Sequence, residues 1–174
     1  MFTRFRILVL LACLSAVPVW AAAPTRATAW QGKGADGQLI RFDPQHLRRP
    51  ALLFFWATWC PYCEAMAPYL QKVYDAAGRD KLDVYAIDIH DEDGHPAATL
   101  RQRHQTFTLV RDGDAIADAY GVRGTPGLFL VDAGGNIVYS LSGGGEPDKV
   151  EVQLRGLLHL SSSARQPAAP RADQ

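Results

Sequence analysis

The junction between an apolar run and a helical pattern at residues 50–77 constrains the fold more than any other feature. Residues 50–57 (PALLFFWA) are continuously apolar, as expected for a strand buried on both faces. A helix is predicted from Pro61 to about Ala77, where apolar residues recur at helical spacing. Cys60 falls where the strand gives way to the helix, and Cys63 lies one turn further along.

The rest of the pattern alternates between strands and helices and predicts one domain over residues 37–160. The expected elements are a strand at 82–89, a short helix at 97–104, a short extended piece at 107–112, a helix at 114–120, two strands around a tight turn at 133–135, and a last helix at 147–160. Such alternation, closed by a hairpin and a helix, indicates a mixed α/β sheet covered on both faces.

The two ends of the chain have patterns of their own. Residues 1–22 have a basic start, a short apolar centre and small residues at the end, which is typical of a secretory signal peptide. An uncleaved inner-membrane anchor and a lipoprotein attached through Cys13 stay open as alternatives. Residues 23–36 are expected to form a flexible segment, and the polar, proline-rich residues 161–174 a disordered tail. With 18 basic and 18 acidic residues, the chain has no charge excess that favours nucleic acid or a membrane surface.

Cys60 has the position of a nucleophile. Pro61 suits the first helical position, and the free N–H groups and positive dipole end of a helix favour a thiolate at Cys60. The thiolate is the reactive form of cysteine. Cys63, at i+3, faces Cys60 and can close a disulfide with it. The pair can therefore exchange disulfides: Cys60 attacks a partner disulfide, and Cys63 releases the product.

Other uses of a C-x-x-C pair fit the surrounding residues less well. A structural zinc site needs four ligands, and His90, His95 and His104 do not form a matching pair. Haem attachment needs a histidine where Glu64 stands, and a copper chaperone typically spaces its cysteines one residue wider. An inert staple that closes so short a loop would stabilise little. We therefore expect redox exchange, with no metal and no cofactor besides the disulfide.

The segment FFWATWCPYC at residues 54–63 resembles the active-site segment of exported TlpA/ResA-like thiol–disulfide oxidoreductases, which have the thioredoxin fold. The resemblance covers residues 38–160 and includes Pro68 inside the first helix and YGVRGTPGLFLVDAGGNIV at 120–138. It implies a thioredoxin-like fold with a central mixed β-sheet flanked by helices on both faces. The extra helix and short strand between residues 89 and 114 look like the TlpA/ResA-type insertion.

The resemblance also implies a substrate-binding surface beside Cys60. Pro126 would follow a cis peptide bond, and Thr125 would offer its backbone to an extended substrate segment. Trp59 would form part of the docking surface. The protein substrates would then be held in place by backbone pairing next to the reactive sulfur.

Several residues near the cysteines are candidate modulators or departures from the family. Pro61 and Tyr62 form the dipeptide between the cysteines. Glu64 either assists proton transfer or disfavours the Cys60 thiolate by like-charge repulsion; the alternative is a solvated surface glutamate. Phe54 stands where thioredoxin has a buried aspartate, and Met66 stands where ResA-like reductases have a glutamate. Both familiar proton acceptors are therefore missing.

The resemblance implies a periplasmic enzyme that reduces protein disulfides through a mixed disulfide on Cys60, in cytochrome c maturation or in refreshing specific client proteins. Its partners would be protein thiols and disulfides, and a membrane protein that donates or accepts electrons, because the periplasm is kept oxidising. We expect a monomer and no nucleic-acid partner. Two alternatives stay open: a disulfide oxidase or isomerase, and a thioredoxin-fold binding module of an envelope complex without turnover.

Overall fold

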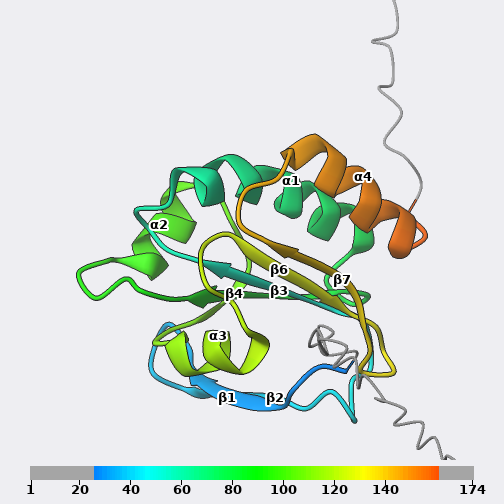
Figure 1. The fold of residues 1–174 in the computed structure, drawn as a ribbon, viewed down its shortest axis with the longest axis horizontal. Coiled ribbons are helices and arrows are strands. Elements are labelled where there is room, and N and C mark those ends of the chain that lie inside the picture. Colours follow the sequence, from blue (N-terminus) through cyan, green and yellow to red (C-terminus); the bar gives the residue numbers. More distant parts are fainter. Residues whose placement is uncertain (1–25, 161–174) are drawn as a thin grey trace, which may run out of the picture.

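A five-stranded sheet forms the centre of the computed structural model, which describes residues 26–160 (Figure 1). Its strands lie in the order β5-β4-β3-β6-β7. Their bounds are β3 (Ala51–Trp56), β4 (Asp83–Asp88), β5 (Thr108–Val110), β6 (Gly127–Val131) and β7 (Ile137–Ser142). β3, β4 and β5 are parallel, whereas β6 runs antiparallel to β3 and to β7. The sheet is therefore mixed, as predicted.

Helices cover both faces of this sheet (Figure 1). Their bounds are α1 (Pro61–Ala77), α2 (Pro96–Gln102), α3 (Asp114–Tyr120) and α4 (Pro147–Leu157). α1, α2 and α4 pack on one face, and α3 lies on the other. The predicted α/β class, with a central sheet between helices, is confirmed.

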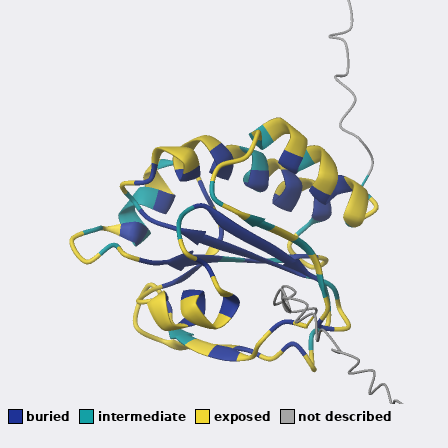
Figure 2. Ribbon diagram, viewed as in Figure 1, coloured by how far each residue is buried: buried dark blue, intermediate teal, exposed yellow. Residues whose placement is uncertain are grey.

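The core has two halves because alternate residues of each strand point to opposite faces. In β3, Leu52, Phe54 and Trp56 join the half under α1 and α4. Leu53 and Phe55 join the half toward α3. All six residues of β3 are buried, as are all five of β6, and both strands are dark blue in Figure 2. This two-sided burial explains why the sequence of β3 is continuously apolar rather than alternating.

An N-terminal hairpin overlaps part of residues 23–36, the segment predicted to be flexible. β1 (Trp30–Lys33) pairs antiparallel with β2 (Leu39–Phe42), which was not predicted either. The Trp30 ring stacks on Phe42 with 5.2 Å between ring centroids, and Trp30 is buried against the α3 face of the core. These tertiary contacts stabilise the hairpin. They join distant residues, so they cannot be read from the short and largely polar sequence of this stretch.

The stretch at residues 26–33, which we call the strap, reaches both edges of the sheet. At one end Arg26 bridges to Asn136 beside β7, and the Ala27 N–H donates to the Gly135 carbonyl over 2.9 Å. At the other end Lys33 bridges to Arg111, just after β5, and its carbonyl accepts from the Arg111 N–H over 2.7 Å. The strap thus pairs with residues that adjoin β7 and β5, which are the two outer strands of the sheet.

The predicted insertion supplies one sheet edge and one helix. α2 and β5 both fall between residues 89 and 114, and β5 extends the sheet beyond β4. The expected signal peptide at 1–22 and tail at 161–174 lie outside the described residues. Within residues 26–160, no helix combines the length and apolar character that crossing a membrane requires.

Candidate active site

Cys60 caps the N-terminus of α1. Its backbone is extended (φ −83°, ψ 109°), and Pro61 occupies the first helical position. Cys60 Sγ accepts a hydrogen bond from the Cys63 N–H over 3.1 Å, and the Cys60 carbonyl accepts from the Glu64 N–H over 3.1 Å. A sulfur at this place receives a donor that an ordinary helix start leaves unsatisfied. The same contact stabilises negative charge on Cys60 when the disulfide is reduced.

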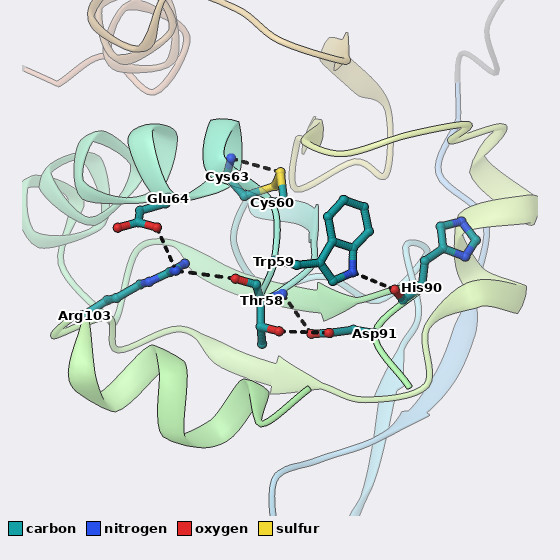
Figure 3. Close-up of a disulfide and its surroundings, with 8 residues drawn as sticks. All are labelled: Thr58, Trp59, Cys60, Cys63, Glu64, His90, Asp91 and Arg103. Atoms are coloured by element: carbon teal, nitrogen blue, oxygen red, sulfur yellow. Dashed lines mark hydrogen bonds and ion pairs between the residues drawn. A yellow bond between two sulfur atoms is a disulfide. The ribbon is translucent and has the colours of Figure 1, made fainter. Parts of the chain in front are cut away.

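The two cysteines form a disulfide across the first turn of α1 (Figure 3). Their Cα atoms are 5.2 Å apart, within the usual range for a disulfide. The exposed fractions are 2% for Cys60 and 1% for Cys63, so both residues are buried. Among the described residues, no group of three or more His, Cys, Asp or Glu side chains is placed to hold a metal ion.

The surroundings of the disulfide inside the protein are apolar. Phe54 and Met66, at the positions where the resemblance implies acids, are 0% and 1% exposed. Both belong to the same core cluster as Cys60 and Cys63. A proton acceptor for Cys63 is therefore not supplied from these two positions.

Thr58, two residues before Cys60, is held from two sides by side chains near α2 (Figure 3). Its N–H and its Oγ1 hydroxyl each donate to the Asp91 carboxylate over 2.8 Å. Its carbonyl accepts from the Arg103 guanidinium over 3.4 Å. Neither Asp91 nor Arg103 is among the predicted site residues. The sequence could have indicated Asp91, because this residue follows a buried strand at the same end of the sheet as Cys60. No sequence pattern points to Arg103.

Glu64 lies on the surface of α1, with its carboxylate turned toward Arg103. Glu64 Oε2 accepts from the same Arg103 nitrogen over 2.9 Å, and the Glu64 side chain is 64% exposed. Figure 3 shows this carboxylate on the far side of the helix turn from the disulfide. Arg103 thus links the first turn of α1 to the loop that precedes it.

Two exposed aromatic side chains flank the disulfide. Trp59 is 61% exposed, and its indole Nε1 donates to the His90 carbonyl over 2.8 Å. Tyr62 is 66% exposed, and its ring lies beside Gly144, in the loop between β7 and α4. Exposed aromatic residues with one fixed contact are typical of protein-binding surfaces. Pro61 is also exposed, so all three predicted residues around Cys60 face outward.

The Thr125–Pro126 segment enters the site from the start of β6. Gly127 is opposite Phe55 in the antiparallel register of β3 and β6, which places Thr125 and Pro126 beside the end of β3 that leads to Cys60. The peptide bond between Thr125 and Pro126 is cis. The Pro126 carbonyl accepts from the Gly143 N–H over 2.9 Å. This hydrogen bond holds the Thr125–Pro126 segment against the loop between β7 and α4, which also lies beside the Tyr62 ring.

A buried carboxyl group, Asp88, lies at the end of β4 and was not predicted as a site residue. It is 7% exposed and pairs in register with Trp56 of β3. Burial, then a hydrogen bond with Asp91 and the charges of that residue and two further aspartates, raise the pKa of Asp88 to about 8. The Asp88 carboxyl is therefore protonated at neutral pH. In the sequence it is hidden inside an otherwise apolar strand.

Comparison with known proteins agrees with a site for thiol–disulfide exchange. The family model described as the AhpC/TSA family matches residues 23–140, which is more than half of the chain. The thiol-disulfide oxidoreductase ResA of Bacillus thuringiensis subsp. konkukian is 29% identical over 104 residues, covering 59% of this chain and 60% of the relative. The thiol:disulfide interchange protein DsbE homolog of Paracoccus denitrificans is 31% identical over 108 residues, covering 60% and 58%. The match therefore spans about three-fifths of the length of these relatives.

A solved structure agrees with the fold. The structure of MTB DsbF in its mixed oxidised and reduced forms superimposes with a TM-score of 0.61 and 27% identity. The superposition covers 74% of this chain and 94% of that one. The predicted thioredoxin-like fold and the TlpA/ResA-like resemblance are both confirmed, and the chain belongs to the AhpC/TSA family.

Proposed function

We propose that this protein is a thiol–disulfide oxidoreductase that reduces the disulfides of other proteins in the periplasm. The observation that carries the proposal is the Cys60–Cys63 disulfide at the N-terminus of α1, with Cys60 Sγ bonded to a backbone N–H. The exposed rings of Trp59 and Tyr62 beside it offer a surface for a protein substrate. The names of the ResA and DsbE relatives agree with this chemistry.

The reaction follows from the order of the two sulfurs. In the reduced protein the Cys60 thiolate attacks one sulfur of a client disulfide, forms a mixed disulfide, and releases the other client sulfur as a thiolate that takes up a proton. Cys63 then loses its proton and attacks the Cys60 sulfur, which releases the second client thiolate. The client gains two electrons and two protons, and the Cys60–Cys63 bond forms again. A dithiol donor must then reduce this bond to complete the cycle.

The apolar surroundings of the disulfide support the reductive direction. Strong oxidants of this fold have a stabilised reduced form, which requires groups that stabilise a thiolate. Here Phe54 and Met66 pack in the same buried cluster as both cysteines and offer no such group. The reduced form is stabilised chiefly by the single N–H of Cys63 at Cys60 Sγ. We therefore place the reduction potential nearer to thioredoxin, at about −270 mV, than to DsbA, at about −120 mV.

The cellular setting follows from the N-terminal pattern and from the chemistry. A signal-like sequence at residues 1–22 favours export, either with cleavage or with retention at the inner membrane. A reductase in an oxidising compartment needs electrons from a membrane partner. From the resemblance to TlpA/ResA-like proteins we propose clients of cytochrome c maturation, which would dock on the exposed surface around Trp59. We propose that the protein acts as a monomer on such clients.

Reduction of insulin by dithiothreitol tests the activity. The wild-type protein should accelerate precipitation of the insulin B chain, and the Cys60→Ser variant should not. The Cys63→Ser variant should accumulate a mixed disulfide with the substrate, since the second step is blocked. Equal rates for the wild type and Cys60→Ser would instead support a binding module without turnover.

Equilibration of the Cys60–Cys63 pair with glutathione tests the direction. A potential well below that of DsbA agrees with a reductase. A potential close to about −120 mV would contradict the reductive direction and support the oxidase or isomerase alternative.

A further inference from the structure

The loop that delivers Cys60 to the helix depends on one carboxylate outside the redox pair. Asp91 accepts both the N–H and the hydroxyl of Thr58, each over 2.8 Å. Thr58 is half-buried and connects β3 to Trp59 and Cys60. Hydrogen bonds to a carboxylate are shorter and stronger than those to a neutral acceptor, so Asp91 is a strong anchor for this loop. Any group that moves Asp91 also moves the approach to the disulfide.

Asp88 is the neighbour that can move Asp91. It is buried at the end of β4, three residues earlier, and it lines the same small cavity as Asp91. Within residues 26–160, Asp88 Oδ1 has no hydrogen-bond partner. A protonated carboxyl can donate to a carboxylate, whereas two ionised carboxylates on one small cavity repel each other. The Asp88 carboxyl therefore supports the anchor only while it holds its proton.

The charges around Asp88 reinforce this dependence. Asp88 lines a cavity of about 120 Å³ together with residues of the surrounding loops. The charged groups that line it come from the loop after β4, the end of β5 and the start of α3: Asp91, Glu92, Arg111, Asp112 and Asp114. Four of these five groups are acidic, and β3 contributes the uncharged Trp56 opposite Asp88. A negative charge at Asp88 would therefore meet acidic groups from several sides. Asp112 is paired with Lys33 and Asp114 with His90, and Arg111 is the one basic residue among those that line the cavity.

We propose that Asp88 is a positioning residue for disulfide exchange, whose protonated carboxyl holds Asp91 against Thr58 and so holds the loop before Cys60. The inference rests on the proposed exchange activity and adds a residue to it. Asp88 does not touch either sulfur in this account; it acts through Asp91 and Thr58. Because burial and the neighbouring charges set its pKa at about 8, the support is present at neutral pH and is lost as the pH rises further.

The Thr58 amide resonance in the oxidised protein tests the positioning directly, because the two cysteines do not titrate in that form. In the wild type this resonance should shift with a single step near pH 8, as Asp91 is displaced. The Asp88→Asn variant should lack the step, since an asparagine amide donates to Asp91 at every pH. Asp118→Asn, which removes one exposed carboxylate on α3, is the matched control and should keep the step.

The rate of insulin reduction tests the link to exchange. The ratio of the wild-type rate constant to that of Asp88→Asn should fall about threefold to tenfold between pH ~6.5 and ~9.5, as expected for the loss of part of a hydrogen bond to a charged group. A ratio that does not change with pH overturns the proposal, as does a Thr58 step that persists in Asp88→Asn or is absent from the wild type. Absence of insulin reduction by the wild type itself would instead refute the proposed function, while the Thr58 titration would still report on the carboxyl pair.

Discussion

Replacing Asp88 with asparagine should make the protein more stable, and increasingly so as the pH rises. The buried carboxyl releases its proton near pH 3.8 in the unfolded chain and near pH 8 in the folded protein. Between these values the folded state binds one more proton than the unfolded state. The contribution of Asp88 to the free energy of unfolding therefore falls with increasing pH across this window.

The size of the effect follows from the same two values. Each pH unit between the two pKa values lowers the contribution of Asp88 to the free energy of unfolding by about 1.4 kcal/mol. This loss of stability reaches about 4 kcal/mol at pH 7. Above pH 8 the group ionises in both states, and the cost stops growing. An asparagine at position 88 has the same shape and still donates to Asp91, but it carries no proton that folding must retain. The variant therefore does not lose this unfolding free energy as the pH rises.

Urea denaturation of the oxidised proteins at several pH values between about 5 and 8 measures this difference. Other titrating groups act equally on both proteins, so only the difference in unfolding free energy is used. That difference should grow by about 1 kcal/mol per pH unit in favour of Asp88→Asn, whereas Asp118→Asn should follow the wild type. A difference between Asp88→Asn and the wild type that is constant over this range would refute a buried, protonated Asp88.

Three further variants test the rest of the site. Glu64→Gln leaves the Arg103 charge unpaired, so the thiolate absorbance of Cys60 should develop at a lower pH than in the wild type, while stability changes by less than about 1 kcal/mol; a shift to higher pH would contradict this. Met66→Glu places a carboxyl group in the apolar cluster next to Cys63, which should lower the stability by about 2 kcal/mol or more and add a new inflection to the pH profile of insulin reduction; an unchanged profile would show that this position does not act on Cys63. Trp59→Ala should reduce kcat/KM for insulin about tenfold, as expected for loss of an aromatic anchor, yet leave reduction of the disulfide by dithiothreitol nearly unchanged; equal losses in both reactions would argue against a docking role.

The elements around the cysteines could be predicted because their signals are local. The helix at Pro61–Ala77 has the predicted bounds, since Pro61 and Gly78 mark its two ends. The helix at Asp114–Tyr120 also agrees, and Gly121 ends it in the left-handed conformation. Where a boundary depends on such residues, the sequence alone is sufficient.

The supports of the active-site loop could not be predicted, because they depend on contacts between distant segments. Asp91 and Arg103 are 33 and 45 residues from Thr58 along the chain. Asp88 interrupts an apolar strand, and only the packing around the end of β4 shows that it is buried beside another carboxylate. The first hairpin was missed for the same reason, since Trp30 finds its partners in Phe42 and Tyr85.

The strap at residues 26–33 has a consequence for the solubility of the protein. β5 and β7 are the outer strands of the sheet, and unpaired strand edges invite pairing with another chain. The strap occupies part of both edges, at Arg111 and at Asn136. A proteolytic cut within the strap would leave the contact at Arg111 joined to the hairpin but would free the segment at Asn136. The edge beside β7 would then be less covered, and the clipped protein would be prone to join other copies there.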